Sequence, residues 1–202
     1  MFALCIPAGD FAGYIFDCDG TLIDSMPIHY RAWDAAMRRN GLRETLSEEL
    51  FYSLGGVPTR QVAERIAQHY GLTIDTEVVF HQKEELFVKL LVDVALIDPV
   101  VAFARRAVAE GKPVSVASGG PRVVVQRSLE LAGLAHLFPI VVTADDVVHG
   151  KPSPDMFLLA AQRMGVPAGL CLVFEDAEPG HLAAEAAGMP SVHVPSRGPR
   201  PV

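Results

Sequence analysis

Two aspartates, Asp17 and Asp19, follow a short apolar stretch near the start of the chain, in the segment DCDGTLID. Carboxylates at positions i and i+2 of an extended chain point to the same side. Two like charges this close repel each other, so a shared proton or a bound cation has to stabilise them. Mg²⁺ suits carboxylate and carbonyl oxygens best. A solvated turn is the alternative, because Asp and Gly are common in turns, but an apolar strand leading into this segment disfavours it.

Three further polar groups also follow apolar runs. Ser118-Gly119 precedes a helical pattern, where a hydroxyl and free N–H groups can hold a phosphate or only cap the helix. Lys151, between a Gly and a Pro, can neutralise phosphoryl and carboxylate charge, unless it is an ordinary solvated lysine. Glu175-Asp176 is a second acid pair, with a helix cap as its alternative role. Each of these groups alone is modest evidence for a functional site, but their joint occurrence is stronger evidence.

The elements that would bring these groups together are visible in an alternation of apolar runs and helical patterns. The predicted strands are residues 14–16, 114–117, 140–142, 170–174 and 191–194, and the predicted helices are residues 99–110, 121–132, 154–164 and 178–187. This order predicts an α/β fold, a Rossmann-like doubly wound parallel sheet covered by helices. Such sheets bind ligands at the carboxyl ends of their strands, where all four groups lie.

Residues 25–94 have a different pattern, with several amphipathic helices and no convincing strand. We predict that they form a small α-helical cap domain inserted after the first strand, so that residues 1–24 and 95–202 form the catalytic core. The last eight residues, PSRGPRPV, are too rich in Pro, Gly and Arg to join that core.

The composition restricts the kind of partner. The chain has 202 residues and a net charge of −7, and an acidic balance disfavours nucleic acid, whose phosphates need a basic surface. No signal peptide is indicated, and residues 86–97, the most apolar candidate for a membrane span, are interrupted by Lys89 and Asp93. The three cysteines lack metal-ligand spacing, so we expect reduced thiols and a cytoplasmic protein.

The order of these motifs resembles that of the haloacid dehalogenase superfamily, in the type with a small helical cap. The matching residues are Asp17-Cys18-Asp19-Gly20-Thr21, Ser118, Lys151 and Glu175-Asp176. Within the superfamily the chain is most similar to the β-phosphoglucomutase-like branch, and residues 149–180 are similar to its fructose-1-phosphate type phosphatases. Cys18 stands where many relatives have Met or another apolar residue, so we expect it to point into the core.

This resemblance implies a Mg²⁺-dependent phosphatase that hydrolyses a small sugar phosphate through an aspartyl-phosphate. Asp17 is then the nucleophile, and Asp19 protonates the leaving oxygen and later deprotonates water. Ser118 and the Gly119 N–H bind phosphoryl oxygens, and Lys151 bridges the phosphate and the nucleophile.

The same resemblance implies the metal ligands. Mg²⁺ is held by the Asp17 carboxylate, the Asp19 backbone carbonyl and Asp176. Glu175 acts through a water molecule or by supporting the other ligands.

Four residues of the predicted cap are candidates for contact with substrate: His29, Gly56, Arg60 and Lys83. In the branch that the chain resembles, positions like His29 and Lys83 help to couple cap closure to acid–base chemistry. Alternatively, His29 only packs, and Arg60 is an exposed arginine at a helix start.

A β-phosphoglucomutase-type isomerase is the nearest rival function. A halide-releasing dehalogenase would need neither Mg²⁺ nor Asp19, and a non-catalytic module would not need the acid pair. The predicted partner is a small phosphorylated sugar, with no nucleic acid and no membrane. A monomer suffices, because cap and core belong to one chain.

Overall fold

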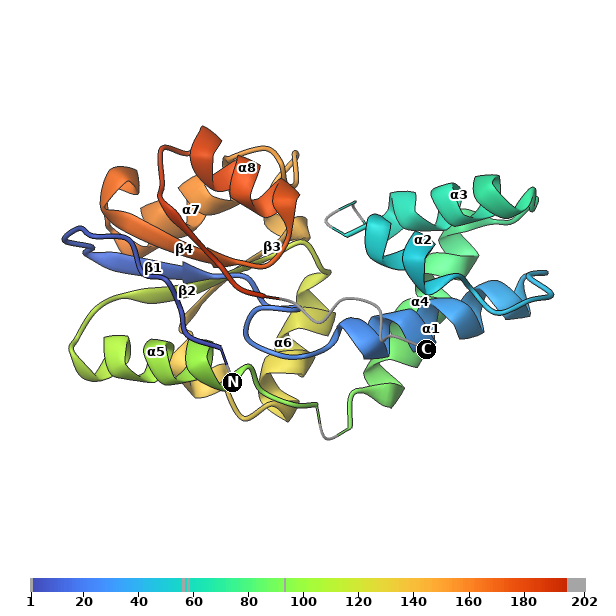
Figure 1. Cartoon of the computed structure of the whole chain (residues 1–202), viewed down its shortest axis with the longest axis horizontal. Helices are drawn as coiled ribbons and strands as arrows, with labels where there is room; N and C mark the ends of the chain where they lie inside the picture. The colour runs from blue at the N-terminus through green and yellow to red at the C-terminus, as the bar shows by residue number, and fades with distance from the viewer. Residues whose placement is uncertain (1, 56, 58, 93, 196–202) are drawn as a thin grey trace.

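The computed structural model describes residues 2–55, 57, 59–92 and 94–195. A parallel sheet with helices on both faces lies beside a separate group of helices (Figure 1). The strands are β1 (Gly13–Phe16), β2 (Val114–Ser118), β3 (Ile140–Thr143), β4 (Cys171–Glu175) and β5 (Ser191–His193). Their order is β3-β2-β1-β4-β5, so the chain winds outward from β1 in both directions. The predicted doubly wound α/β fold is confirmed.

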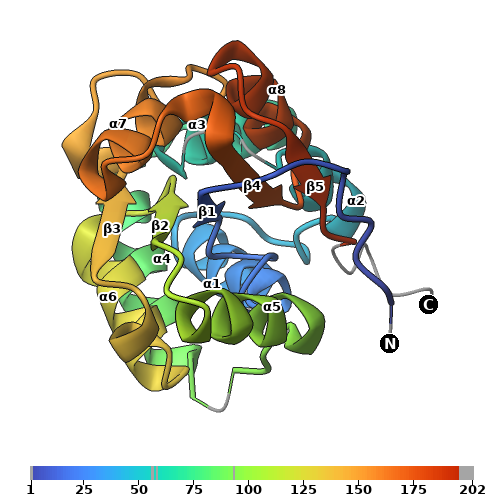
Figure 2. The same cartoon turned by 90° about the vertical axis from the view of Figure 1, so that its left-hand side faces the viewer.

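Each face of the sheet has its own apolar layer, because successive residues of a strand point to opposite faces. Phe16 packs with α5 (Asp98–Ala109) and α6 (Arg122–Leu131), whereas Ile15 packs with α7 (Asp155–Met164) and α8 (Glu178–Ala186). Figure 2 shows β1 between these two layers. Cys18 is fully buried in the first layer, as predicted. Short 3₁₀ helices follow α6, β3 and α7, in this order: η1 (Ala135–Leu137), η2 (Ala144–Asp146) and η3 (Ala168–Leu170).

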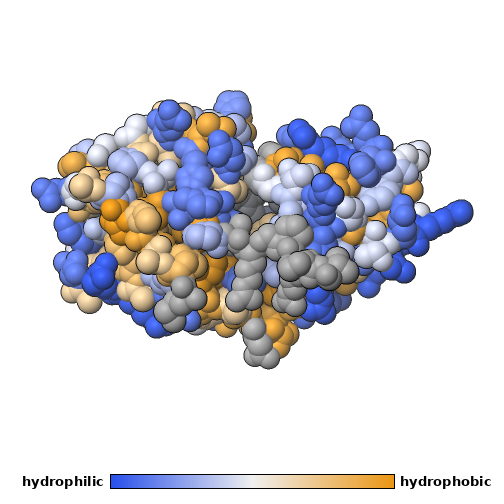
Figure 3. Space-filling view, viewed as in Figure 1, coloured by the Kyte–Doolittle hydropathy of each residue, from blue (hydrophilic) through white to orange (hydrophobic). Residues whose placement is uncertain are grey.

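The helices between β1 and α5 form a cluster of their own. They are α1 (Met26–Arg39), α2 (Glu48–Ser53), α3 (Thr59–Tyr70) and α4 (Thr76–Leu90). Trp33, Phe51 and Ile66 lie in their shared apolar interior. In the space-filling view, the visible face of this group is mostly hydrophilic (Figure 3). A separate interior supports the predicted division into residues 25–94 and the remainder, which we keep as a proposal and call cap and core.

Two chain segments connect cap and core, and they run side by side. Ile23 and Leu96 form an antiparallel bridge, and the Asp24 N–H donates to the Ala95 carbonyl at 2.8 Å. Near them, Phe87 of α4 and Leu91, the residue after this helix, pack with Val124 of α6. The cap therefore rests on a paired connection and a small apolar contact. No helix in the described part of the chain is long and apolar enough to cross a membrane.

Candidate active site

Three of the four predicted polar groups lie at the ends of strands, on the carboxyl edge of the sheet. Asp17 directly follows β1, while Ser118 and Glu175 are the last residues of β2 and β4, the two neighbours of β1. The Asp17 N–H donates to the Phe174 carbonyl at 3.0 Å, which extends the sheet pairing up to the acid. Backbone pairing thus holds Asp17 near two residues that are far away in sequence, Ser118 at 101 positions and Glu175 at 158 positions.

Lys151 joins these strand ends electrostatically. Its Nζ donates to Asp17 Oδ1 at 2.7 Å and to Glu175 Oε2 at 2.8 Å. Asp17 is 6% exposed and Glu175 is 2% exposed, so both hydrogen bonds lie away from bulk water. Burial alone would lower the pKa of Lys151, but the negative charges of Asp17 and Glu175 outweigh it and raise that pKa. Lys151 is therefore a fixed cation, as a phosphate-binding site needs.

The acids around Lys151 have the chemistry of a metal site. Carboxylate oxygens of Asp17, Glu175 and Asp176 lie within 4.8 Å of one another. Burial, followed by repulsion from Glu175, raises the pKa of Asp17 well above its usual value and that of Asp176 to about 7. When ionised, the three acids carry more negative charge than one lysine balances. A divalent cation would balance the remainder, and an all-oxygen donor set suits Mg²⁺.

Two glycines let these acids converge. Gly20 has a φ of +85°, and a Cβ there would lie 2.2 Å from Asp176 Oδ2. Gly180, in the first turn of α8, would place a Cβ 2.0 Å from the Glu175 carboxyl carbon. Any larger residue at either position would displace an acid of the cluster.

The Asp19 carboxylate turns toward the cap instead. Its Oδ1 accepts a hydrogen bond from Ser25 Oγ at 2.6 Å and lies 3.2 Å from His29 Nε2. Burial alone would raise the pKa of Asp19, but His29, Ser25 and Lys83 together lower it to about 2. Burial and Lys83 lower the pKa of His29 from its usual value, against the opposing effect of Asp19.

Aromatic rings fix the two predicted cap residues near Asp19. His29 stacks on Phe87, with 3.9 Å between ring centroids. The Lys83 ammonium lies 5.1 Å from the centroid of the same ring and 5.6 Å from that of Trp33. The structure therefore brings His29 and Lys83 to one place beside Asp19.

Ser118 is buried, and its Oγ accepts a hydrogen bond from the Gly120 N–H at 3.2 Å. The hydroxyl hydrogen is still able to donate to a phosphoryl oxygen. Gly119 is exposed and has no atom within 4 Å of the position of a Cβ. Both stay predictions as phosphate-binding groups.

Arg60, another predicted cap contact, makes its side-chain contacts with residues of the cap. Arg60 pairs with Glu77, and its guanidinium lies 4.3 Å from the centroid of the Phe80 ring. Its role toward substrate stays a prediction. Gly56 lies outside the described residues.

Sequence reasoning missed Ser25. The residue stands immediately before α1, where a serine normally caps the helix. Here the serine makes no side-chain cap and donates to Asp19 instead. A serine at the N-cap position gives no signal that separates these two roles.

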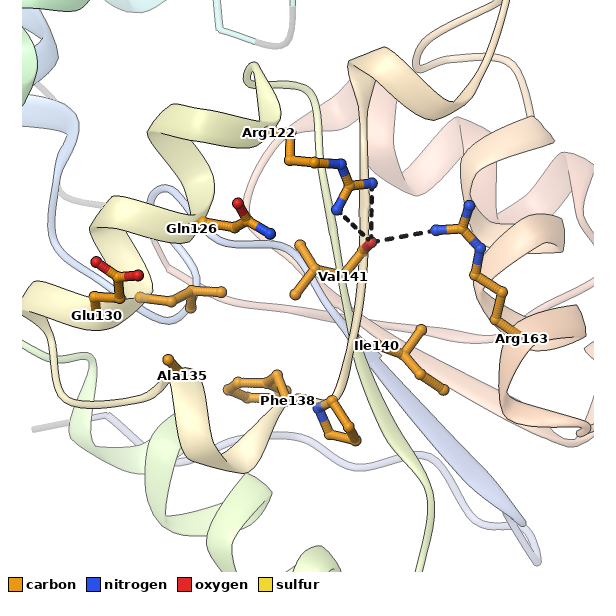
Figure 4. Close-up of a pocket in the computed structure, with 10 residues that line it drawn as sticks. Arg122, Gln126, Glu130, Ala135, Phe138, Ile140, Val141 and Arg163 are labelled. Atoms are coloured by element: carbon orange, nitrogen blue, oxygen red, sulfur yellow. Dashed lines mark hydrogen bonds between the residues drawn. The ribbon is translucent and has the colours of Figure 1, made fainter.

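A surface pocket of about 610 Å³ at the β3 edge of the sheet has a structural explanation (Figure 4). Arg122 and Arg163 approach from two helices and donate to the Val141 carbonyl. Both arginines also pair with Asp146. Because these cations are already paired, we assign the pocket to protection of an edge strand and not to substrate binding.

The Gly180 geometry gives a test of the acid cluster. An Ala in a helix normally stabilises it relative to Gly, but Gly180→Ala should destabilise the protein by about 1–3 kcal/mol, because the new methyl overlaps Glu175. Gly169→Ala, whose Cβ would meet no atom within 4 Å, is the control. Urea unfolding of both variants measures the difference, and a Gly180→Ala protein as stable as the native chain would contradict the close approach.

The comparisons with known proteins agree with this geometry. A family model for haloacid dehalogenase-like hydrolases matches residues 11–188. Fructose-1-phosphate phosphatase YqaB of Escherichia coli is 38% identical over 91% of this chain and 96% of its own length. Hexitol phosphatase A of the same organism is 32% identical over 93% of this chain and 86% of its own.

Among solved structures, a β-phosphoglucomutase from Clostridium difficile superposes with a TM-score of 0.77, covering 90% of this chain and 83% of its own. At 21% identity this likeness concerns the fold. The family model describes hydrolases, and the two relatives named above are phosphatases, so these matches also indicate the activity. The chain belongs to the haloacid dehalogenase-like hydrolase family, and it is a phosphatase of that family.

Proposed function

We propose that this phosphatase hydrolyses a small sugar phosphate through an aspartyl-phosphate on Asp17, with Mg²⁺ as its cofactor. The observation that carries the proposal is Lys151, whose side chain is 9% exposed and bonds to Asp17 and Glu175, together with Asp19, which contacts His29 of the cap. The relatives named for fructose 1-phosphate and hexitol phosphates support the sugar class. A monomer contains every residue that the reaction needs.

Asp17 supplies the nucleophilic oxygen. Lys151 holds one oxygen of its carboxylate, Oδ1, and so orients the other. That oxygen attacks phosphorus while the bond from phosphorus to the sugar oxygen breaks. The Ser118 hydroxyl, the Gly119 N–H and the Lys151 ammonium stand ready to balance charge on the phosphoryl oxygens.

Asp19 moves the protons. It donates a proton to the departing sugar oxygen and then accepts one from the water that attacks the aspartyl-phosphate. With a pKa of about 2, Asp19 is ionised in this arrangement, which suits the second of these steps. A phosphate dianion beside it raises that pKa, as any like charge does, and so prepares the first step.

Mg²⁺ would be held by Asp17, Asp176 and the Asp19 backbone carbonyl. When bound, it supplies positive charge that stabilises the transferring phosphoryl group. Asp176 Oδ1 accepts a long hydrogen bond, 3.4 Å, from Thr21 Oγ1. Both Glu175 oxygens already accept hydrogen bonds, from Lys151 and the Ala177 N–H. Glu175 therefore serves as a positioning residue for Lys151.

The cap completes the site by bringing His29 and Lys83 against Asp19. Closure of the cap would exclude bulk water while one water molecule stays within reach of Asp19. Ser25 is the N-cap residue of helix α1, and His29 lies in the first turn of this helix. Their hydrogen bonds to Asp19 therefore depend on the position of the cap domain relative to the core.

Asp17→Asn removes the nucleophile, so phosphate release from fructose 1-phosphate should fall to background. EDTA should have the same effect on the native protein, and added Mg²⁺ should restore its activity. A colorimetric phosphate assay measures both, with the exposed Asp10→Asn as the control. Full activity in Asp17→Asn or in EDTA would refute the mechanism.

Asp19→Asn separates proton transfer from metal binding. Turnover should fall about 10²- to 10⁴-fold, the usual contribution of a positioned acid–base group. Mg²⁺ affinity, measured by calorimetry, should persist, because the variant keeps the backbone carbonyl. If Mg²⁺ affinity were lost as well, the Asp19 side chain would be part of the metal site.

Hydrolysis and isomerisation share the core residues, so products have to distinguish them. A mutase protects the aspartyl-phosphate from water, whereas a phosphatase delivers water to Asp19. We expect inorganic phosphate as the main product of fructose 1-phosphate, and little glucose 6-phosphate from β-glucose 1-phosphate with a priming bisphosphate. A coupled dehydrogenase assay checks this. Rapid glucose 6-phosphate formation with little phosphate release would make the protein an isomerase.

A further inference from the structure

Glu84, in α4, has one carboxylate oxygen that the fold leaves unused. Its Oε1 accepts a hydrogen bond from Lys83 Nζ at 2.9 Å. Its Oε2 is buried and has no hydrogen-bond partner among the residues that the structure describes. The residue as a whole is 9% exposed. A buried carboxylate oxygen without a donor is unfavourable unless something outside the fold supplies one.

The position of Glu84 points to the substrate as that donor. Glu84 raises the pKa of His29 and Lys83 lowers it, so both lie within electrostatic reach of this ring. His29 Nε2 is 3.2 Å from Asp19, and the Lys83 ammonium lies over the Phe87 ring on which His29 stacks. Glu84 thus belongs to the same group of cap side chains as Lys83 and His29, and His29 contacts Asp19.

We propose that Glu84 is a specificity-determining residue, whose Oε2 accepts hydrogen bonds from hydroxyl groups on the sugar part of the substrate. The inference rests on the proposed function. An ionised carboxylate can only accept hydrogen bonds, so it favours hydroxyl donors. It also repels a second anionic group, so a sugar monophosphate should be preferred to the corresponding bisphosphate.

A purely structural role is the alternative for Glu84. It would then do no more than neutralise the buried Lys83, whose ammonium lies between the Trp33 and Phe87 rings. Loss of the carboxylate would in that case impair every substrate by the same factor. The comparison of substrates therefore decides between the two roles.

The experiment uses the full chain and three phosphate esters. These are fructose 1-phosphate, fructose 1,6-bisphosphate and p-nitrophenyl phosphate, which has no hydroxyl groups. The variants are Glu84→Gln, which keeps the size of the side chain, and Glu84→Ala. The control is Glu85→Gln at the next position of α4, where the side chain is exposed and pairs with Lys89.

In both Glu84 variants, kcat/KM for fructose 1-phosphate should fall about 10- to 100-fold relative to that for p-nitrophenyl phosphate, the range for one hydrogen bond to a charged group. The ratio of fructose 1,6-bisphosphate to fructose 1-phosphate should rise, because the repelling charge is gone. The control should keep both ratios. Circular dichroism confirms folding, and the isosteric Glu84→Gln decides the matter if Glu84→Ala does not fold.

The outcomes separate this inference from the proposed function. A native protein that hydrolyses fructose 1-phosphate, with unchanged substrate ratios in Glu84→Gln, would overturn the role of Glu84 alone. A native protein that prefers the bisphosphate would overturn it too. A native protein that hydrolyses p-nitrophenyl phosphate but no sugar monophosphate in a panel would refute the proposed substrate class, and the inference with it.

Discussion

The site depends on the ammonium group of Lys151. Lys151 lies between Asp17 and Glu175, at 2.7 and 2.8 Å from their oxygens. Without this cation, the carboxylates at the ends of β1 and β4 would repel each other in a medium that cannot screen them. The neighbouring backbone is fitted to the same cluster, because Gly20 and Gly180 approach Asp176 and Glu175 more closely than a Cβ would allow. The sheet brings the acids together, and Lys151 makes their proximity stable.

Asp19 stands at the boundary between two parts of the chain. Its backbone belongs to the loop after β1, but its carboxylate is held by Ser25 and His29, from the start of α1. The antiparallel bridge of Ile23 and Leu96 lies between that loop and the cap. A displacement of α1 relative to the core would therefore change the hydrogen bonds of Asp19, and with them its pKa. The proposed acid–base residue is in this way coupled to the position of the cap.

The fold and the core side of the site could be predicted from the sequence because both depend on local patterns. Each apolar run led to a strand, and the carboxyl ends of adjacent parallel strands necessarily meet, which brought Asp17, Ser118 and Glu175 together. The cap side could not be predicted in the same way. Nothing in the pattern around Ser25 separates a helix cap from a partner of Asp19, and Glu84 resembles any acid on a helix until its burial is seen. Those roles arise from the packing of helices, which periodicity does not specify.

Two aspartates two residues apart thus acquire opposite properties from their surroundings. The environment of Asp17 is short of positive charge, so its pKa is raised by burial and by Glu175, whereas hydrogen-bond donors surround Asp19 and lower its pKa. Environments that push the pKa values of neighbouring acids apart are how one site assigns them different tasks. A phosphate monoester with a divalent counter-ion would oppose both pKa shifts. The cation would supply positive charge beside Asp17 and Asp176, and the negative charge of the phosphate would raise the pKa of Asp19 against the effect of its hydrogen-bond donors. The two halves of the site are therefore complementary to the same ligand, although the core provides one half and the cap the other.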